Sequence, residues 1–95
     1  MAIRVLLERE IEPGQEMNLL QFLIQLRSKA MAARGYISGE TLRALDNPNK
    51  YLVISTWTTL EDWKAWEAHP ARKELQEELE RFLRSPEKTT VYVYI

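Results

Sequence analysis

The chain has 95 residues, of which 45% are hydrophobic and 28% are charged. This is the balance of a folded domain, and we expect a single domain spanning residues 1–95. Thirteen basic and fourteen acidic residues leave a net charge of −1. Since nucleic-acid binding needs a concentrated positive field, the charge pattern predicts no nucleic-acid partner. There are no cysteines, which excludes disulfides, thiolate metal sites and cysteine nucleophiles.

The longest apolar stretch, residues 17–26, contains Asn18, Gln21 and Gln25. It is therefore too short and too polar to cross a bilayer, and the sequence predicts no membrane partner. The N-terminal segment lacks the charged-then-apolar order of a secretory signal. We therefore expect the cytoplasm as the default location.

The first third of the chain predicts a strand followed by a helix. The strand covers Ala2–Ile11, because apolar side chains alternate along it, and Pro13-Gly14 ends it. The helix covers Gln15–Arg34, with Gly35 placed as its C-terminal cap. The apolar residues that recur near helical spacing, and that therefore define its expected inner face, are Met17, Leu20, Leu23, Ile24, Ala30 and Met31.

The middle third predicts an antiparallel hairpin. Tyr36–Leu45 is expected to be a strand, although Gly39 weakens it. Asp46–Asn49 is a turn by composition. The strand that follows, Tyr51–Trp57, is rich in β-branched and aromatic residues. The link between the two strands is short, so they are expected to pair antiparallel.

The last third predicts two helices and a strand. A short helix begins within Thr58–Asp62 and runs to about Glu67. After a break at His69-Pro70, a second helix covers Ala71–Leu83, and the final strand covers Thr89–Ile95. Two pairs at the start of the short helix have or approach capping-box spacing, namely Thr58 with Glu61 and Thr59 with Asp62.

This order of elements predicts an α+β, ferredoxin-like βαββαβ fold, if the two helices of the last third count as one broken helix. The fold is a four-stranded antiparallel sheet with the helices on one face. The other face of the sheet is apolar as well. Its expected apolar residues are Leu6, Leu52, Ile54, Tyr92 and Tyr94. Soluble monomers rarely leave such a patch open, so we expect a second copy to cover it in a two-fold homodimer. The alternative is a set of scattered surface apolar residues that needs no explanation.

Few residues offer chemistry. His69 is the one histidine, and its place before a proline suits capping a helix or facing solvent as well as a catalytic or ligand role. One histidine and no cysteine predict no metal site. Trp57, Trp63 and Trp66 lie close together in the sequence. Trp63 is expected in the core, whereas Trp66 either packs there or lines a pocket for a planar or aromatic ligand.

The segment from Val53 to Trp66 resembles the antibiotic biosynthesis monooxygenase domain family. It combines the strand Val53–Trp57, a short polar turn and the helix Leu60–Trp66, whose second Trp lies nine positions after Trp57. The resemblance implies a dimeric α/β barrel in which two sheets pack face to face. It also implies a pocket between sheet and helices in each subunit. Some members oxidise aromatic polyketides without a metal or organic cofactor, others cleave haem, and others isomerise small metabolites.

Haem-degrading members use an Asn on the first strand, a Trp on the short helix and a His on the next helix. These positions fall on Leu7, Trp66 and Gln76, so only the Trp matches. Haem degradation is therefore disfavoured, and two hypotheses remain. One is a cofactor-independent monooxygenase acting on a small aromatic or quinone-like compound. The other is a non-catalytic dimer that binds a small hydrophobic ligand.

The site residues that follow from this resemblance fall into two groups, and neither includes a cofactor or a metal. The catalytic candidates are Trp66 and His69. The expected substrate-binding residues are Leu7, Tyr36, Trp57, Trp66 and Gln76.

Overall fold

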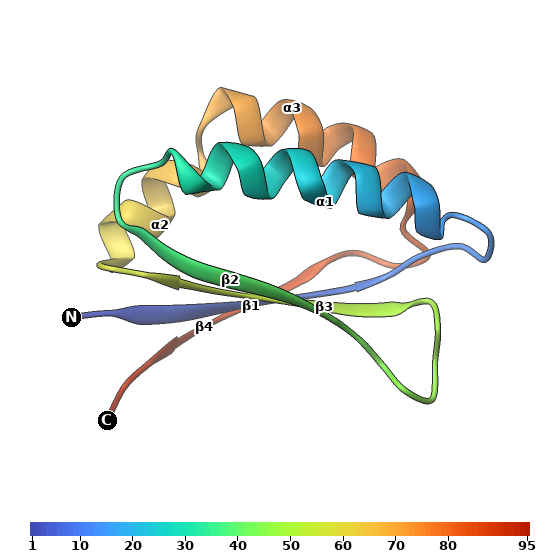
Figure 1. Ribbon diagram of the computed structural model, residues 1–95, viewed down its shortest axis with the longest axis horizontal. Coiled ribbons are helices and arrows are strands. Elements are labelled where there is room, and N and C mark those ends of the chain that lie inside the picture. Colours follow the sequence, from blue (N-terminus) through green and yellow to red (C-terminus); the bar gives the residue numbers. More distant parts are fainter.

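The computed structural model describes all 95 residues, and it confirms the predicted order of elements and the ferredoxin-like α+β fold (Figure 1). A 3₁₀ turn, η1, follows the last helix. The elements are β1 (Ile3–Glu10), α1 (Glu16–Met31), β2 (Tyr36–Arg43), β3 (Lys50–Trp57), α2 (Leu60–Glu67), α3 (Pro70–Leu79), η1 (Glu80–Phe82) and β4 (Lys88–Val93). No helix has the length and apolar character needed to cross a membrane.

The four strands form one antiparallel sheet in the order β2-β3-β1-β4. All three helices lie on the same side of this sheet, and no element covers its other side (Figure 1). Burial alternates along β1, so its odd-numbered residues face the helices and its even-numbered residues face away. Leu6 pairs with Ile54, and Leu52 pairs with Leu42, which places these four side chains on the uncovered face. We call this surface the open face.

The core lies between the sheet and the helices, with Trp57 and Trp63 almost fully buried at one end. The prediction for the inner face of α1 was largely wrong. Leu19, Leu26 and Ala30 are buried there, together with the half-buried Phe22 and Leu23. The exposed apolar side chains of α1 are Met17, Leu20, Ile24 and Met31.

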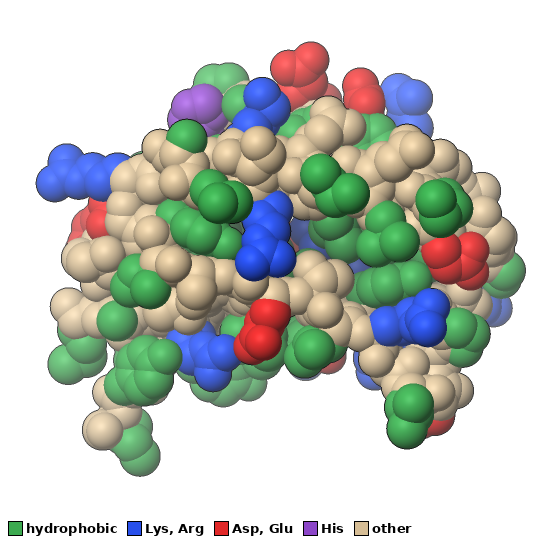
Figure 2. Space-filling model, in the orientation of Figure 1, with side chains coloured by type: hydrophobic (Ala, Val, Ile, Leu, Met, Phe, Trp, Pro, Cys, Tyr) green, Lys and Arg blue, Asp and Glu red, His purple; other side chains and the backbone are tan.

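The physical reason is that α1 carries apolar residues on two sides, so helical spacing alone cannot choose between them. Figure 2 shows apolar side chains along the helix nearest the viewer, which is α1.

The helix starts follow local hydrogen bonding. Thr59, rather than Thr58, caps α2, because its hydroxyl accepts from the backbone N–H of Asp62 at 3.1 Å. His69 caps α3 through Nδ1, which accepts from the backbone N–H of Ala71 at 3.1 Å, and Pro70 occupies the first turn. The predicted last helix was too long at its C-terminal end, since η1 replaces its final turn.

Gly35 joins α1 to β2 with φ +85°, a conformation that suits glycine. Its carbonyl accepts from the backbone N–H of Thr58 at 2.8 Å and from the Thr58 hydroxyl at 3.1 Å. A Cβ at this position would collide with the side chain of Asp62. Gly35 therefore ties the start of β2 to the start of α2.

We expect Gly35→Ala to lower the free energy of unfolding by more than the backbone cost of about 1–2 kcal/mol. Gly14→Ala is the matched control, since Gly14 has φ +88° but open space where a Cβ would stand. Urea unfolding of both variants measures the difference. Equal losses would show that contact with Asp62 adds nothing.

Candidate functional site

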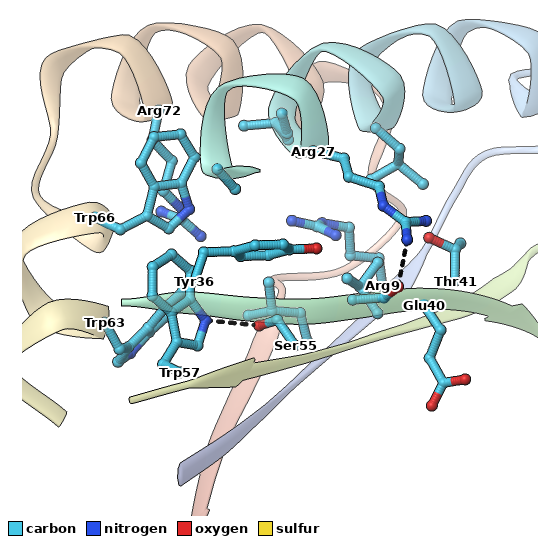
Figure 3. A pocket seen from close by; sticks show the side chains of 16 residues that line it. Arg9, Arg27, Tyr36, Glu40, Thr41, Ser55, Trp57, Trp63, Trp66 and Arg72 are labelled. Carbon is cyan, nitrogen blue, oxygen red and sulfur yellow. Dashed lines mark hydrogen bonds between the residues drawn. The ribbon is translucent and has the colours of Figure 1, made fainter. Parts of the chain in front are cut away.

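A cavity lies between the helix side of the sheet and the three helices. β1, β2 and β3 form its floor, α1 covers it, and α2 and α3 close one end (Figure 3). Its volume is about 70 Å³. By the same measure, one water molecule needs roughly 10–15 Å³. As it stands, the cavity has room for a few water molecules or one small ring.

One end of the cavity is aromatic. The ring of Trp57 stacks with that of Trp66 at 6.5 Å between centroids and 23° between planes. Trp63 packs against the Trp57 ring, with 5.8 Å between the ring centroids. The Trp57 indole N–H donates to the Ser55 hydroxyl at 3.0 Å, which fixes the orientation of the ring (Figure 3). These flat, apolar walls suit a planar ligand.

Tyr36 extends into the same space from the start of β2. Its ring meets Trp57 edge-on at 5.3 Å and 83°. The hydroxyl lies above Gly39, where an added Cβ would stand only 2.5 Å away. Gly39, which weakens the strand pattern, therefore leaves room for the phenol of Tyr36 inside the cavity.

Arg27 crosses the rim between α1 and β2. Its guanidinium donates to the backbone carbonyl of Gly39 at 2.6 Å, and its side chain is exposed (Figure 3). Glu40 is near the same rim, but its carboxylate points away from the cavity and pairs with Arg4 at 3.5 Å on the open face (Figure 3). A ligand larger than one ring would require Arg27 to move.

Two buried arginines line the cavity beyond the tryptophans. Arg9 is 3% exposed, and its Nε donates to the Glu87 carboxylate at 2.7 Å. Gln76 accepts from Arg9 at 3.3 Å and donates to the same carboxylate at 2.6 Å. Arg72 is 7% exposed, and its guanidinium lies 5.4 Å from the ring centre of Trp63. We call Arg9, Arg72, Gln76 and Glu87 the arginine network.

Desolvation by burial lowers the pKa of the Arg9 guanidinium below its ordinary value, although the nearby Glu87 carboxylate opposes this by raising it. Burial likewise lowers the pKa of Arg72, opposed first by Glu87 and then by the more distant carboxylates of Glu67 and Glu80. Guanidinium groups nevertheless stay protonated in proteins. The arginine network therefore holds two positive charges against one carboxylate.

The structure brings four of the predicted site residues together on the cavity wall, namely Leu7, Tyr36, Trp57 and Trp66. Gln76 does not line the cavity; it holds Arg9 and Glu87 from behind. His69 also lies outside the wall, 5.8 Å from the Trp66 ring, with its Nδ1 occupied in capping α3. The capping role accounts for its place before Pro70.

Sequence reasoning missed Arg9, Arg27 and Arg72. For two of them the sequence carries a signal. Arg9 continues the buried alternation of Ile3, Val5 and Leu7 on β1. Arg72 lies three and seven residues before Leu75 and Leu79, the buried residues of α3, and so shares their face. A charged residue in phase with the core indicates either a buried ion pair or a binding site.

Comparisons with known proteins agree with this architecture. A family model described as antibiotic biosynthesis monooxygenase matches residues 2–78. Protein SchA of Streptomyces halstedii is 27% identical over 82 residues, which are 86% of this chain and 22% of that protein. The 42.8 kDa protein in the whiE locus of Streptomyces coelicolor is 27% identical over 64 residues, 67% of this chain and 16% of that protein. The chain thus spans about a fifth of the length of these curated relatives.

Solved structures share the fold. A conserved protein from Methanosarcina mazei superposes with a TM-score of 0.91 at 18% identity, covering 97% of this chain and 91% of that one. SnoaB, described as a cofactor-independent oxygenase from Streptomyces nogalater, gives 0.89 at 14% identity, covering 99% of this chain and 93% of that one. At these identities the likeness concerns the fold alone. Since the family model matches residues 2–78 of 95, the chain belongs to the antibiotic biosynthesis monooxygenase family.

Proposed function

We propose that this protein is a cofactor-independent monooxygenase that acts on a small aromatic or quinone-like compound in the cavity between sheet and helices. The observation that carries this assignment is the aromatic end of the cavity, where Trp57 and Trp66 stack and Trp63 and Tyr36 complete the wall. Family membership and the likeness to SnoaB, a cofactor-independent oxygenase, support the reaction class. The small volume favours one ring over a polycyclic system.

The reaction can be balanced without a cofactor if the substrate supplies the electrons. A hydroquinone and one O₂ give a hydroxyquinone and one water: one oxygen atom enters the ring and the other leaves as water. The substrate must first lose a phenolic proton to solvent water, because the phenolate is the electron-rich form, and an equivalent proton is taken up when the product water forms. Protonated Arg9 and Arg72 stabilise that anion electrostatically. The protein's part is then to hold the ring between aromatic walls and to favour its ionised form.

The same proposal includes a homodimer formed through the open face. Leu6, Leu42, Leu52 and Ile54 form a continuous apolar centre on this face by their register. Two ion pairs flank this centre, Arg4 with Glu40 at 3.5 Å and Lys88 with Glu8 at 4.0 Å. Arg4 and Glu8 lie on the inner strand β1, so a partner that covers the apolar centre would also cover part of these ion pairs. The cavity lies on the opposite side of the sheet, so pairing would leave it free.

We expect Trp66→Phe to lower kcat/KM at least tenfold, because phenylalanine shrinks the ring that stacks with Trp57 and removes the indole N–H of Trp66. Oxygen uptake with a panel of substituted hydroquinones measures this in buffer containing a metal chelator. His69→Asn is the companion variant, since Asn retains helix capping. We expect it to keep near-normal turnover, because His69 lies outside the cavity wall. Absence of oxygen uptake by the unmodified protein would count against the proposal.

A second candidate function is non-catalytic binding of a small hydrophobic ligand. It is favoured by one observation: no imidazole and no inward-pointing carboxylate lines the cavity (Figure 3). A ligand that raises Tm without any turnover would support this alternative.

Haem chemistry is disfavoured by the same geometry. Gln76 stands where the resemblance places the haem-ligating His, and its side chain is engaged with Arg9 and Glu87.

A further inference from the structure

Arg72 is the least satisfied charged group in the interior. Its one charged partner within 4 Å is Glu87, and the distance of 3.8 Å is too long for a hydrogen bond. Glu87 already receives hydrogen bonds from Arg9 and Gln76 on one carboxylate oxygen. The Arg72 guanidinium therefore lines the cavity with donors to spare, at 7% residue exposure.

A second donor of the cavity wall has no partner. The indole N–H of Trp63, also on the wall, is buried and has no hydrogen-bond partner. A buried donor without a partner costs about 1–3 kcal/mol, and a buried unpaired charge costs more. Such groups persist in native proteins where a ligand supplies the missing acceptor. Glu67 and Glu80 also raise the pKa of Arg72, but neither comes within 4 Å of its guanidinium, so its donors remain free for a negatively charged, oxygen-rich ligand.

We infer that the arginine network is an anion subsite, and that the ligand of this cavity is a single aromatic ring bearing a negatively charged oxygen group, such as a carboxylate. The ring lies against the tryptophans, and the charged group meets Arg72 and the free side of Arg9. A planar guanidinium matches a carboxylate in shape and charge. This inference deepens the proposed function and rests on its cavity, but it names a substrate class that the reaction class does not require.

The experiment compares two ligands of nearly the same shape. Gentisate (2,5-dihydroxybenzoate) carries a carboxylate beside a hydroquinone ring, and 2,5-dihydroxybenzamide is its neutral isostere. Titration calorimetry at pH 7 measures both, and quenching of tryptophan fluorescence reports ring contact. We expect gentisate to bind at least tenfold more tightly than the amide, as charge-assisted hydrogen bonds require.

Arg72→Gln tests the residue itself. We expect it to weaken gentisate binding at least tenfold and to change amide binding less than threefold. Arg81→Gln is the matched control, because it removes the same charge from an exposed position in η1. Arg81→Gln should change neither the affinity for gentisate nor the affinity for the amide. Circular dichroism and Tm confirm folding, and the ligand comparison in the unmodified protein stands even if Arg72→Gln is destabilised.

Equal affinities for the acid and the amide would overturn the inference, as would an unchanged preference in Arg72→Gln or an equal loss in Arg81→Gln. The outcomes separate this inference from the proposed function. Selective binding of gentisate without oxygen uptake would sustain the anion subsite and defeat the monooxygenase. Oxygen uptake with neutral hydroquinones and no preference for the acid would do the reverse.

Discussion

Replacing Ile54 with lysine at the centre of the open face should convert a homodimer into a monomer. Ile54 pairs across the sheet with Leu6 and lies on the face that no helix covers (Figure 1). A lysine there would bury an ammonium group between the two sheets, beside a Glu40 carboxylate that is already paired with Arg4, at a cost of several kcal/mol. We expect the dissociation constant of the dimer to rise at least a hundredfold, equivalent to about 2.8 kcal/mol. Sedimentation equilibrium measures it directly.

Ile24→Lys is the matched control for this change. Ile24 is an isoleucine on the outer side of α1 and is 68% exposed, so it offers the same substitution on another apolar surface. We expect Ile24→Lys to remain dimeric. A dimer that survives Ile54→Lys but dissociates with Ile24→Lys would place the interface on α1 rather than on the sheet.

Glu87→Gln should be the most destabilising single change in the arginine network. The Glu87 carboxylate accepts from Arg9 at 2.7 Å and from Gln76 at 2.6 Å, and it is the one carboxylate within 4 Å of both buried guanidinium groups. Glutamine keeps an acceptor but removes the charge. Breaking a buried ion pair from one side costs about 3–5 kcal/mol, a large share of the 5–15 kcal/mol typical of a small domain. Urea unfolding at fixed protein concentration measures the loss.

Two further variants show whether that loss of stability comes from the buried charge. Glu77→Gln makes the same change at an exposed position on α3 and should stay within about 0.5 kcal/mol of the unmodified protein. Arg9→Met added to Glu87→Gln removes one of the two uncompensated charges and should recover part of the stability. If Glu87→Gln is as mild as Glu77→Gln, the network does not hold the buried charge described above.

The sequence predicts the fold well because each element carries a local signal that tertiary contacts reinforce. The alternation in β1 places Ile3, Val5 and Leu7 on the helix side as expected. The break at His69-Pro70 separates α2 from α3 where the capping histidine and the proline indicate it. The apolar residues of the open face were likewise visible as an excess beyond what the helices can cover.

The inner face of α1 was not predictable in the same way, because two apolar stripes compete and only packing against the sheet selects Leu19 and Leu26. Only part of the candidate site could be predicted from the sequence. The tryptophans stand out by residue type, whereas the arginine network joins β1, α3 and the residue before β4 through contacts such as Arg9 to Glu87, 78 residues apart. The spacing of buried residues along β1 and α3 can point to Arg9 and Arg72. Their shared partner, the Glu87 carboxylate, can be identified only in the folded chain.

We expect ligands to bind in the cavity under the helices, and we expect the open face to serve pairing. The most direct test is a ¹H–¹⁵N spectrum of the labelled protein during titration with gentisate. We expect the largest shifts in the tryptophan indole N–H signals and in the Arg72 Nε–H signal, with the backbone amides of Leu52 and Ile54 unmoved. Shifts centred on Leu52 and Ile54, with the indole signals unchanged, would contradict it.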